Sequence, residues 1–188
     1  EAVRRSGSKM GRLAELGTTG TKVPLAFAVT VDGFNDHFAA TGLDAAIDAE
    51  LQGADLSDHP ALEVIADRIR GLIVSTPILE SLADQIVDAY EELCDRASDL
   101  NVPTAVRSSA TGEDGADSSF AGIFDTFLGV SGSPRVLEAV RACWASLFSA
   151  RAIAYRARHG ISHHAMPMAV GVVELVHARA SGVAFSIH

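Results

Sequence analysis

The apolar and polar positions along the chain switch between two spacings, and this switching predicts a mixture of helices and strands. In the segment GSKMGRLAELG at 7–17, the apolar side chains fall on one side of a short helix that Gly17 would end. The apolar run at 23–30 indicates a buried strand. Asp32 is then expected to cap a helix that ends near Gly42.

Residues 45–97 form the most strongly helical part of the sequence. The segments SDHPALEVIADRIRGLIVS at 57–75 and TPILESLADQIVDAYEELCDRA at 76–97 each open with a capping residue one or two positions before a proline. In the second segment, acidic residues fill the face opposite the apolar one, which is most simply a solvated surface. A metal site on that face is the alternative.

The second half of the chain predicts two strands, then two helices, then a closing pair of strands. In order, these are the segments at 102–110, 123–130, 134–148, 149–160, 166–176 and 181–187. Residues 177–180 have the length of a hairpin loop, so the last two strands are expected to pair antiparallel. The pattern therefore predicts an α+β fold rather than a doubly wound parallel sheet.

Size and charge limit the kinds of partner. The chain has 188 residues, enough for one domain or two small lobes, with a possible division into 1–104 and 105–188. Its formal net charge of −9 repels nucleic-acid backbones and anionic membranes, so neither is expected as a partner. No apolar run is long enough for a membrane-spanning helix, and no leader pattern is evident at the start.

The two cysteines and the chain ends add two expectations. Cys94 and Cys143 fall at apolar positions of helical segments, so we expect reduced core residues of a cytoplasmic protein, with a disulfide as the alternative. The sequence begins without methionine and stops inside an apolar pattern, so we expect it to be part of a longer protein.

The polar segment between the strands at 102–110 and 123–130 carries residues that suit a polyphosphate. Arg107 offers a permanent planar cation at a strand end, and Ser108, Ser109 and Thr111 offer hydroxyl and backbone donors to anionic oxygens. Glycines such as Gly122 would let the segment act as a covering loop. The alternative is a solvent loop that happens to follow a strand arginine.

Two further positions extend this idea to a nucleotide. Lys9 follows a Gly-Ser pair at a helix start, where amide groups and the helix dipole favour phosphate, although the spacing is not that of a P-loop. Glu174, Leu175 and Val176 lie where a strand runs out, and such a run-out offers a purine an apolar slot and free backbone groups. The alternatives are an exposed helix-terminal lysine and an ordinary hairpin with one edge acid.

Taken together, these segments resemble a known family. In order, GSKMGRLAEL, VPLAFAVTVDGF, AVRSSATGEDGADSSFAGIFDTFLGV, VLEAVRACWASLFSARAIAYRARHG and AVGVVELVHARASGVAFSIH are similar to the N-terminal ATP-binding domain of the phosphoenolpyruvate synthase and pyruvate phosphate dikinase family. Rifampin phosphotransferase and phenylphosphate synthase share that domain. The resemblance covers nearly the whole chain and is weakest across 45–100.

The resemblance implies an ATP-grasp-like nucleotide-binding lobe, with a mixed or antiparallel sheet and flanking helices, that is incomplete at its C-terminus. Lys9 is similar to the family's phosphate-binding lysine, and Arg107 to the arginine at the reacting end of the phosphates. Residues 111–122 resemble the cover of the triphosphate, and Glu174–Val176 the strand that reads adenine. We therefore expect Lys9 and Arg107 to converge beneath this cover.

The chain also departs from the family. Gly7-Ser8 stands where the family usually has Gly-Gly, and Glu174 replaces a common glutamine. The family's metal-binding acids and its phosphohistidine domain have no counterpart within these residues. His159, His163 and His164 do not match that phosphohistidine, so we expect structural or solvent-exposed roles for them.

The leading functional hypothesis is an ATP-dependent phosphotransferase with ATP and Mg²⁺ as cofactors. By resemblance, it would transfer a phosphoryl group through a histidine of another domain, or of a partner subunit, to a small acceptor such as pyruvate, a phenol or an antibiotic hydroxyl. The isolated chain would then be inactive. The alternatives are a non-catalytic nucleotide-binding or regulatory module and, less favoured, a purely structural domain.

Overall fold

The computed structural model describes residues 2–56, 58–110, 114–115, 118–119 and 124–182. The helices are α1 (Ala2–Thr18), α2 (Val31–Thr41), α3 (Leu43–Leu51), α4 (His59–Ser75), α5 (Glu80–Ala97), α6 (Ser133–Ser146), α7 (Ala150–Arg158) and the short 3-10 helix η1 (His163–Ala165). The strands are β1 (Ala26–Val29), β2 (Thr104–Ala110), β3 (Asp114–Gly115), β4 (Ser118–Ser119), β5 (Thr126–Val130) and β6 (Met168–Glu174).

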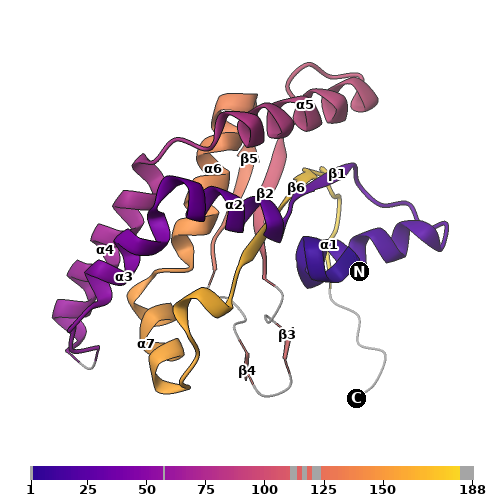
Figure 1. The fold of residues 1–188 in the computed structure, drawn as a ribbon. Coiled ribbons are helices and arrows are strands. Elements are labelled where there is room, and N and C mark those ends of the chain that lie inside the picture. Colours follow the sequence, from indigo (N-terminus) through magenta and orange to yellow (C-terminus); the bar gives the residue numbers. More distant parts are fainter. Residues whose placement is uncertain (1, 57, 111–113, 116–117, 120–123, 183–188) are drawn as a thin grey trace, which may run out of the picture.

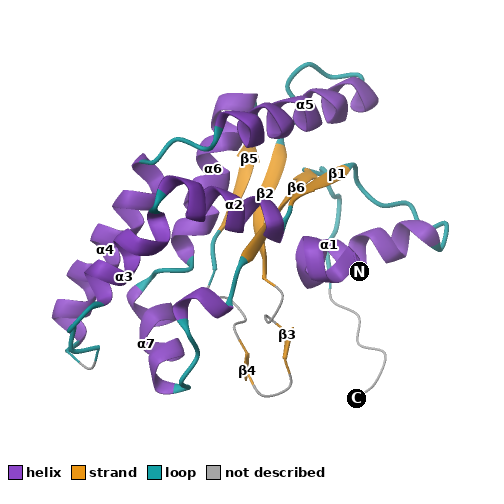
Figure 2. Cartoon of the chain, in the orientation of Figure 1, coloured by secondary structure: helices purple, strands orange, loops and turns teal. Residues whose placement is uncertain are grey.

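The main sheet has the strand order β1-β6-β2-β5, and each neighbouring pair is antiparallel (Figure 2). β6 is the last strand among the described residues but lies inside the sheet, where Val170 and Val172 are fully buried. β3 and β4 form a separate two-stranded pair. The predicted α+β fold is confirmed, and its main sheet is antiparallel rather than mixed.

Helices cover both faces of the main sheet. α6 packs against β2, β5 and β6, and α4 and α5 pack against α6, whereas α1 packs against β2 and β6 from the other face (Figure 1). The core lies mainly on the α6 face, where Phe38, Ile69 and Trp144 are buried. Among the described residues, α1 is the helix that packs across β2 and β6 on the other face.

Two predicted helix boundaries are wrong. Thr30, not Asp32, caps α2, because the helix begins two residues earlier than expected and the Thr30 hydroxyl accepts from Gly33 N at 3.2 Å. Thr76 ends α4 instead of opening the next helix, and α5 begins at Glu80. The proline at 77 explains the second difference, since the residue before a proline is disfavoured in the helical conformation.

Two predicted strands differ from the structure in extent. The strand expected at 23–30 is shortened to β1. β6 ends at Glu174, and residues 175–182 contain no strand. In place of the predicted hairpin with a following strand, β6 pairs with β1 and β2. The rest of the strand expected at 181–187 lies outside the described residues. The division into lobes at 104/105 stays a prediction, although the sheet combines strands from both parts.

Candidate functional site

The first turn of the main part of α1 docks onto the end of β2. The helix is interrupted at Gly7, which has a φ of 75°, and continues from Ser8. The Ser8 hydroxyl donates to the carbonyl of Ala110 at 3.4 Å, and the backbone N–H of Met10 donates to Ser109 Oγ at 3.3 Å. Residues about a hundred positions apart in the chain are thereby held side by side.

Lys9 lies between these two contacts and reaches the same part of β2. Its Nζ donates to the carbonyl oxygen of Ser108 at 3.4 Å, and its side chain is half-buried. Ser108 directly follows Arg107 in the strand. Lys9 thus contacts β2 next to Arg107, which lies in the middle of this strand rather than at the strand end that the sequence predicted.

Arg107 is half-buried on the sheet face that α1 covers. Its neighbours in register are Thr126 on β5 and Gly171 on β6. A Cβ on Gly171 would overlap the side chain of Met10, which places this face of β6 directly under α1. Within the described residues, Arg107 Nε is buried and has no hydrogen-bond partner. A guanidinium with an unpartnered N–H can still bind an anion.

The two serines after Arg107 are enclosed by the fold. Ser108 and Ser109 are 1% and 0% exposed. The Ser109 hydroxyl already accepts from Met10, and the Ser108 N–H donates to the carbonyl of Asp125 at 3.5 Å. Thr111 and Gly122, the other two predicted phosphate-site residues, lie outside the described residues.

The predicted adenine segment lies at the other end of β6. Glu174 is three residues beyond the partner of Arg107, which corresponds to about 10 Å along a strand. Its Oε2 accepts from Leu25 N at 3.1 Å. The Leu175 N–H donates to the carbonyl of Pro103 at 2.8 Å, so the fold already uses one of the backbone groups expected for a purine. The Val176 side chain is 60% exposed.

An apolar cavity of about 240 Å³ lies close to this segment. It opens between α1 and the residues that lead into β1, and Leu25, the partner of Glu174, is part of its wall. Its lining residues are Met10, Leu13, Ala14, Gly17, Val23, Pro24, Leu25, Ala26 and Arg96. The cavity offers an apolar slot on the side of Glu174, along the same helix that presents Lys9.

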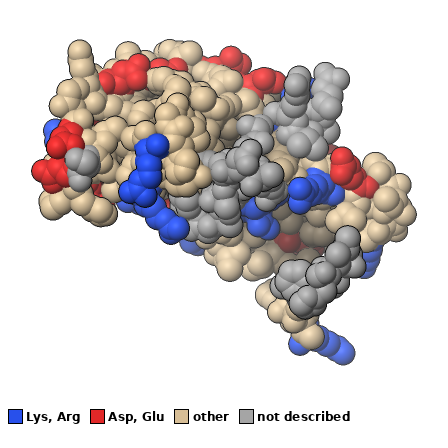
Figure 3. Space-filling view, turned by 90° about the horizontal axis from the view of Figure 1, so that it is seen from below, with Lys and Arg blue, Asp and Glu red and all other residues tan. Residues whose placement is uncertain are grey.

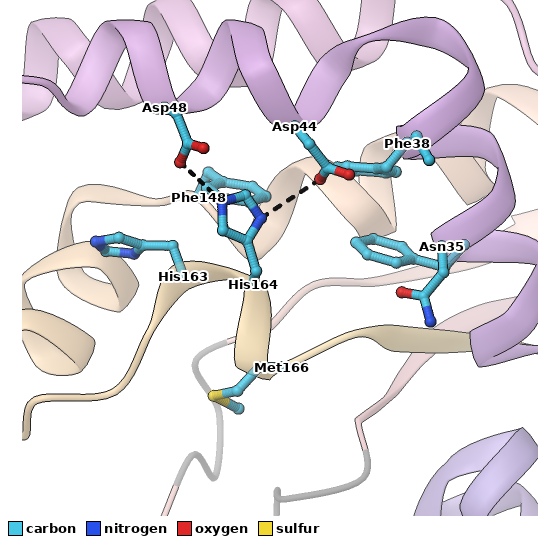
Figure 4. Close-up of a pocket in the computed structure, with 10 residues that line it drawn as sticks. Asn35, Phe38, Asp44, Asp48, Phe148, His163, His164 and Met166 are labelled. Carbon is cyan, nitrogen blue, oxygen red and sulfur yellow. Dashed lines mark hydrogen bonds and ion pairs between the residues drawn. The ribbon is translucent and has the colours of Figure 1, made fainter.

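A second cavity, of about 400 Å³, lies between α2, α3 and η1 (Figure 4). His164 enters it between two acids of α3, with Nε2 at 2.7 Å from Asp48 Oδ1 and Nδ1 at 3.4 Å from Asp44 Oδ1. His163 Nδ1 accepts from Arg156 Nε at 3.1 Å. Burial and the charge of Arg156 lower the pKa of His163 to about 4. Neither this cavity nor the smaller one is lined by Lys9 or Arg107.

The remaining predicted features behave as follows. His159 stacks on Tyr155 and bonds to its carbonyl at 2.8 Å, so it is also engaged within the fold. Cys94 and Cys143 are buried and unpaired, as predicted. Burial, reinforced by Asp125, raises the pKa of the Cys143 thiol to about 12. Cys143 is therefore a core residue rather than a nucleophile.

Charge, metal and membrane signals complete the description. Seen from below, several separate groups of Lys and Arg side chains lie on one face, and most acidic side chains lie toward the edge of the view (Figure 3). The described residues contain no group of three His, Cys, Asp or Glu side chains that could hold a metal ion. Among the same residues, no helix is both long and apolar enough to cross a membrane.

Sequence reasoning missed two positions in this site. Gly7 appeared only as a departure from a family pattern, and Gly171 was not singled out at all. A lone glycine inside a strand pattern, as at 171, is a signal of close backbone approach that could have drawn attention to it. The partners of both glycines depend on long-range packing and had no local signal.

Comparison with known proteins identifies the family to which this chain is similar. The family model described as pyruvate phosphate dikinase, AMP/ATP-binding domain, matches residues 3–188. Among the relatives, a probable phosphoenolpyruvate synthase of Methanothermobacter thermautotrophicus is 40% identical over 97% of this chain and 27% of its own length. The phosphoenolpyruvate synthase of Escherichia coli is 41% identical over 98% of this chain and 24% of its own length. The chain thus spans about a quarter of these relatives, and it belongs to the family of pyruvate phosphate dikinase AMP/ATP-binding domains.

Proposed function

We propose that this chain is the ATP-binding part of a dikinase-type phosphotransferase. Such an enzyme would pass a phosphoryl group from ATP to a histidine in another domain or a partner subunit, and then to a small acceptor such as pyruvate. The observation that carries the proposal is the meeting of Lys9 with the strand of Arg107, where Arg107 Nε is buried without a partner among the described residues. An anionic phosphate would supply that partner.

The two cations have distinct roles in this proposal. Arg107, with its planar set of donors, would hold the transferring phosphate, and Lys9 would add a compact positive charge beside it. Both charges would stabilise the negative charge that grows on the phosphoryl oxygens during transfer. Ser108, Thr111 and Gly122 complete the proposed phosphate end, whereas the Ser109 hydroxyl is already bonded to Met10 N. Each charge-assisted contact would contribute about 1.5–3 kcal/mol.

We place adenine at Glu174–Val176, with the apolar cavity beside Leu25 as the candidate slot. The separation of about 10 Å along β6 between this segment and the partner of Arg107 suits an extended nucleotide. Because the Leu175 N–H is already bonded to Pro103, the ring edge of the purine would be read by other backbone groups of this segment. The ATP-grasp-like character of the site belongs to the same proposal.

Magnesium needs separate treatment. Mg²⁺ prefers several oxygen ligands and usually binds proteins together with substrate phosphates. In the part of the chain that the structure describes, no group of three acidic, histidine or cysteine side chains fits such an ion. We therefore propose that Mg²⁺ would be held chiefly by the phosphates of ATP, and we assign no catalytic step to the ion. A cytoplasmic location likewise stays a prediction.

A nuclear magnetic resonance titration of this chain with MgATP tests the proposal, because it detects even millimolar affinity. We expect shifts at the amides of Lys9, Arg107 and Glu174–Val176. Replacing either cation, as in Lys9→Ala or Arg107→Ala, should weaken ATP binding about tenfold or more. Lys22→Ala, at the other of the two lysines, and Arg68→Ala, on the exposed face of α4, are matched controls that should change affinity less than about twofold. Absence of any shift at these positions, or equal losses in the controls, would overturn the proposal.

The second candidate is a non-catalytic nucleotide-binding module. It predicts the same titration but no phosphoryl transfer. The parent protein separates the two: incubation with ATP labelled at the terminal phosphates should label a histidine outside this chain in the enzyme and leave a module unlabelled. In the enzyme, Arg107→Ala should abolish that label.

A further inference from the structure

The residues on both sides of Lys9 are fixed to the sheet by close contacts. Gly7 packs directly against the backbone of Ser109, and a Cβ at position 7 would overlap the Ser109 carbonyl oxygen. The φ of 75° at Gly7 is also a conformation that side chains with a Cβ rarely adopt. Glycine is therefore required at this position for two independent reasons, and the contacting atom is backbone that cannot rotate away.

Ser109 holds the residue on the other side of Lys9. Its hydroxyl is enclosed, with the residue 0% exposed, and accepts from the N–H of Met10. This N–H belongs to the first turn of the helix that continues after Gly7, where donors have no partner within the helix. The Met10 side chain in turn fills the space that Gly171 leaves open on β6. Position 9 is thus held from both sides.

A lysine needs such support more than an arginine does. Its four-carbon side chain is flexible, and each charge–phosphate contact depends on where the backbone starts that chain. A displacement of about 1 Å at a reacting group can remove much of the rate acceleration that its positioning provides. Fixing the backbone on each side of Lys9 reduces the rearrangement required when a phosphate binds.

We propose that Gly7 and Ser109 are positioning residues for the terminal phosphates, and that they act through Lys9. This inference rests on the proposed nucleotide function. Ser109 then contributes by orienting the lysine segment rather than by contacting phosphate itself, since its hydroxyl is buried and already bonded to Met10. Gly7 and Ser109 would therefore affect the binding of the polyphosphate chain and not the binding of the adenosine part of the nucleotide.

The test compares the affinities of ATP and AMP for the same variants, measured by the amide shifts described above. A general loss of structure would weaken both ligands, whereas a positioning defect should weaken ATP alone. We expect Ser109→Ala to weaken ATP binding about 2- to 10-fold, the range of one ordinary hydrogen bond, with AMP affinity changed less than about twofold. Gly7→Ala should have the larger effect, about tenfold or more on ATP.

Two matched controls separate positioning from stability. Ser146→Ala removes another buried serine hydroxyl, which donates to the Cys143 carbonyl at 2.6 Å on α6. Gly20→Ala introduces a Cβ at a φ of 80° with nothing within 4 Å, so it carries the backbone strain of Gly7→Ala without the overlap. Both should leave the ratio of ATP to AMP affinity unchanged.

The outcomes distinguish this inference from the proposed function. If the unaltered chain binds ATP and Lys9→Ala weakens it, but Ser109→Ala and Gly7→Ala leave the ATP to AMP ratio unchanged, the positioning role is wrong and the proposed function stands. If those two variants weaken ATP and AMP equally, their role is structural, which also overturns the inference. If the unaltered chain shows no nucleotide shifts, both fail together.

Discussion

Two arginines lie against the core of this protein, and the fold surrounds them differently. Arg156 is 0% exposed, donates through Nε to His163 and lies over the ring of Phe148 with Cζ at 5.3 Å from its centroid. Burial lowers its pKa to about 10. Arg107 is only half-buried, and among the described residues its Nε has no hydrogen-bond partner.

We interpret Arg156 as a structural cation and propose Arg107 as the cation that binds a ligand. The Nη groups of Arg156 are also without hydrogen bonds in the described part of the chain, but they are enclosed, and the face of Phe148 offsets part of the cost. Arg107 is only half-buried, and it lies in β2 next to Ser108, whose carbonyl accepts from Lys9. The cavity of about 400 Å³ is lined by His163, the partner of Arg156, and by neither Arg107 nor Lys9.

The largest expected effect is on stability at Arg156. Arg156→Ala removes a fully buried side chain and its bond to His163, and should lower the free energy of unfolding by about 3 kcal/mol. Arg107→Ala should lower it by less than about 1 kcal/mol, because that side chain is only half-buried. Urea denaturation of both variants measures the difference. Equal losses would remove the distinction drawn between the two arginines.

The next largest expected effect is on the free energy of unfolding, through the packing of α1 on β6. Gly171→Ala should cost about 1–3 kcal/mol, because its Cβ would overlap the side chain of Met10. In a Met10→Ala background the same change should cost much less, since the overlapping atoms are gone. A double-mutant cycle of unfolding free energies would therefore show a coupling of about 1 kcal/mol or more. Additive effects would mean that α1 does not rest on Gly171.

The histidine region should show a pH dependence that the Arg107 region lacks. The folded pKa of His163 is lowered from 6.5 to about 4 by burial and Arg156, with His164 also lowering it and Asp48 raising it. The unfolded chain therefore binds more protons, so stability is present above the unfolded pKa and is lost as pH falls toward the folded one. Between about pH 7 and pH 5 the loss from this group should be about 1–2 kcal/mol. His163→Gln should flatten this part of the stability profile, and an unchanged slope would contradict the assignment.

The smallest expected effect on the free energy of unfolding comes from the ion pairs of His164 with Asp44 and Asp48. Asp44 and Asp48 are 45% and 65% exposed, so solvent screens their pairing with this histidine. Asp44→Asn or Asp48→Asn should change the free energy of unfolding by less than about 1 kcal/mol, and still less at high salt. Neither change should alter nucleotide affinity. A tenfold loss of ATP affinity would move the functional site to this cavity.

Local chemistry explains which parts of this fold could be predicted from the sequence. Asp58 caps α4 as expected, with Oδ1 accepting from Ala61 N, because a cap depends only on residues three positions apart. Thr76 shows the limit of such reasoning, since a capping residue before a proline can close one helix as well as open another. The residue types at Lys9 and Arg107 indicated anion chemistry without any structure.

The rest depends on contacts between distant positions. Gly7 meets Ser109, and Met10 meets Gly171, only once α1 lies across the sheet. His164 meets Asp48 across 116 positions. No periodicity or cap reports such pairings, because strand register and helix placement are set by the packing of the whole core.

Arg107 Nε has no hydrogen-bond partner within the described part of the chain, so the most direct measurement follows that atom. In a titration of the ¹⁵N-labelled chain with MgATP, the Nε–H resonance of Arg107 should shift and exchange more slowly with water, while that of Arg156, already bonded to His163, should stay unchanged. An Arg107 signal that does not move while other residues report bound ATP would contradict the account.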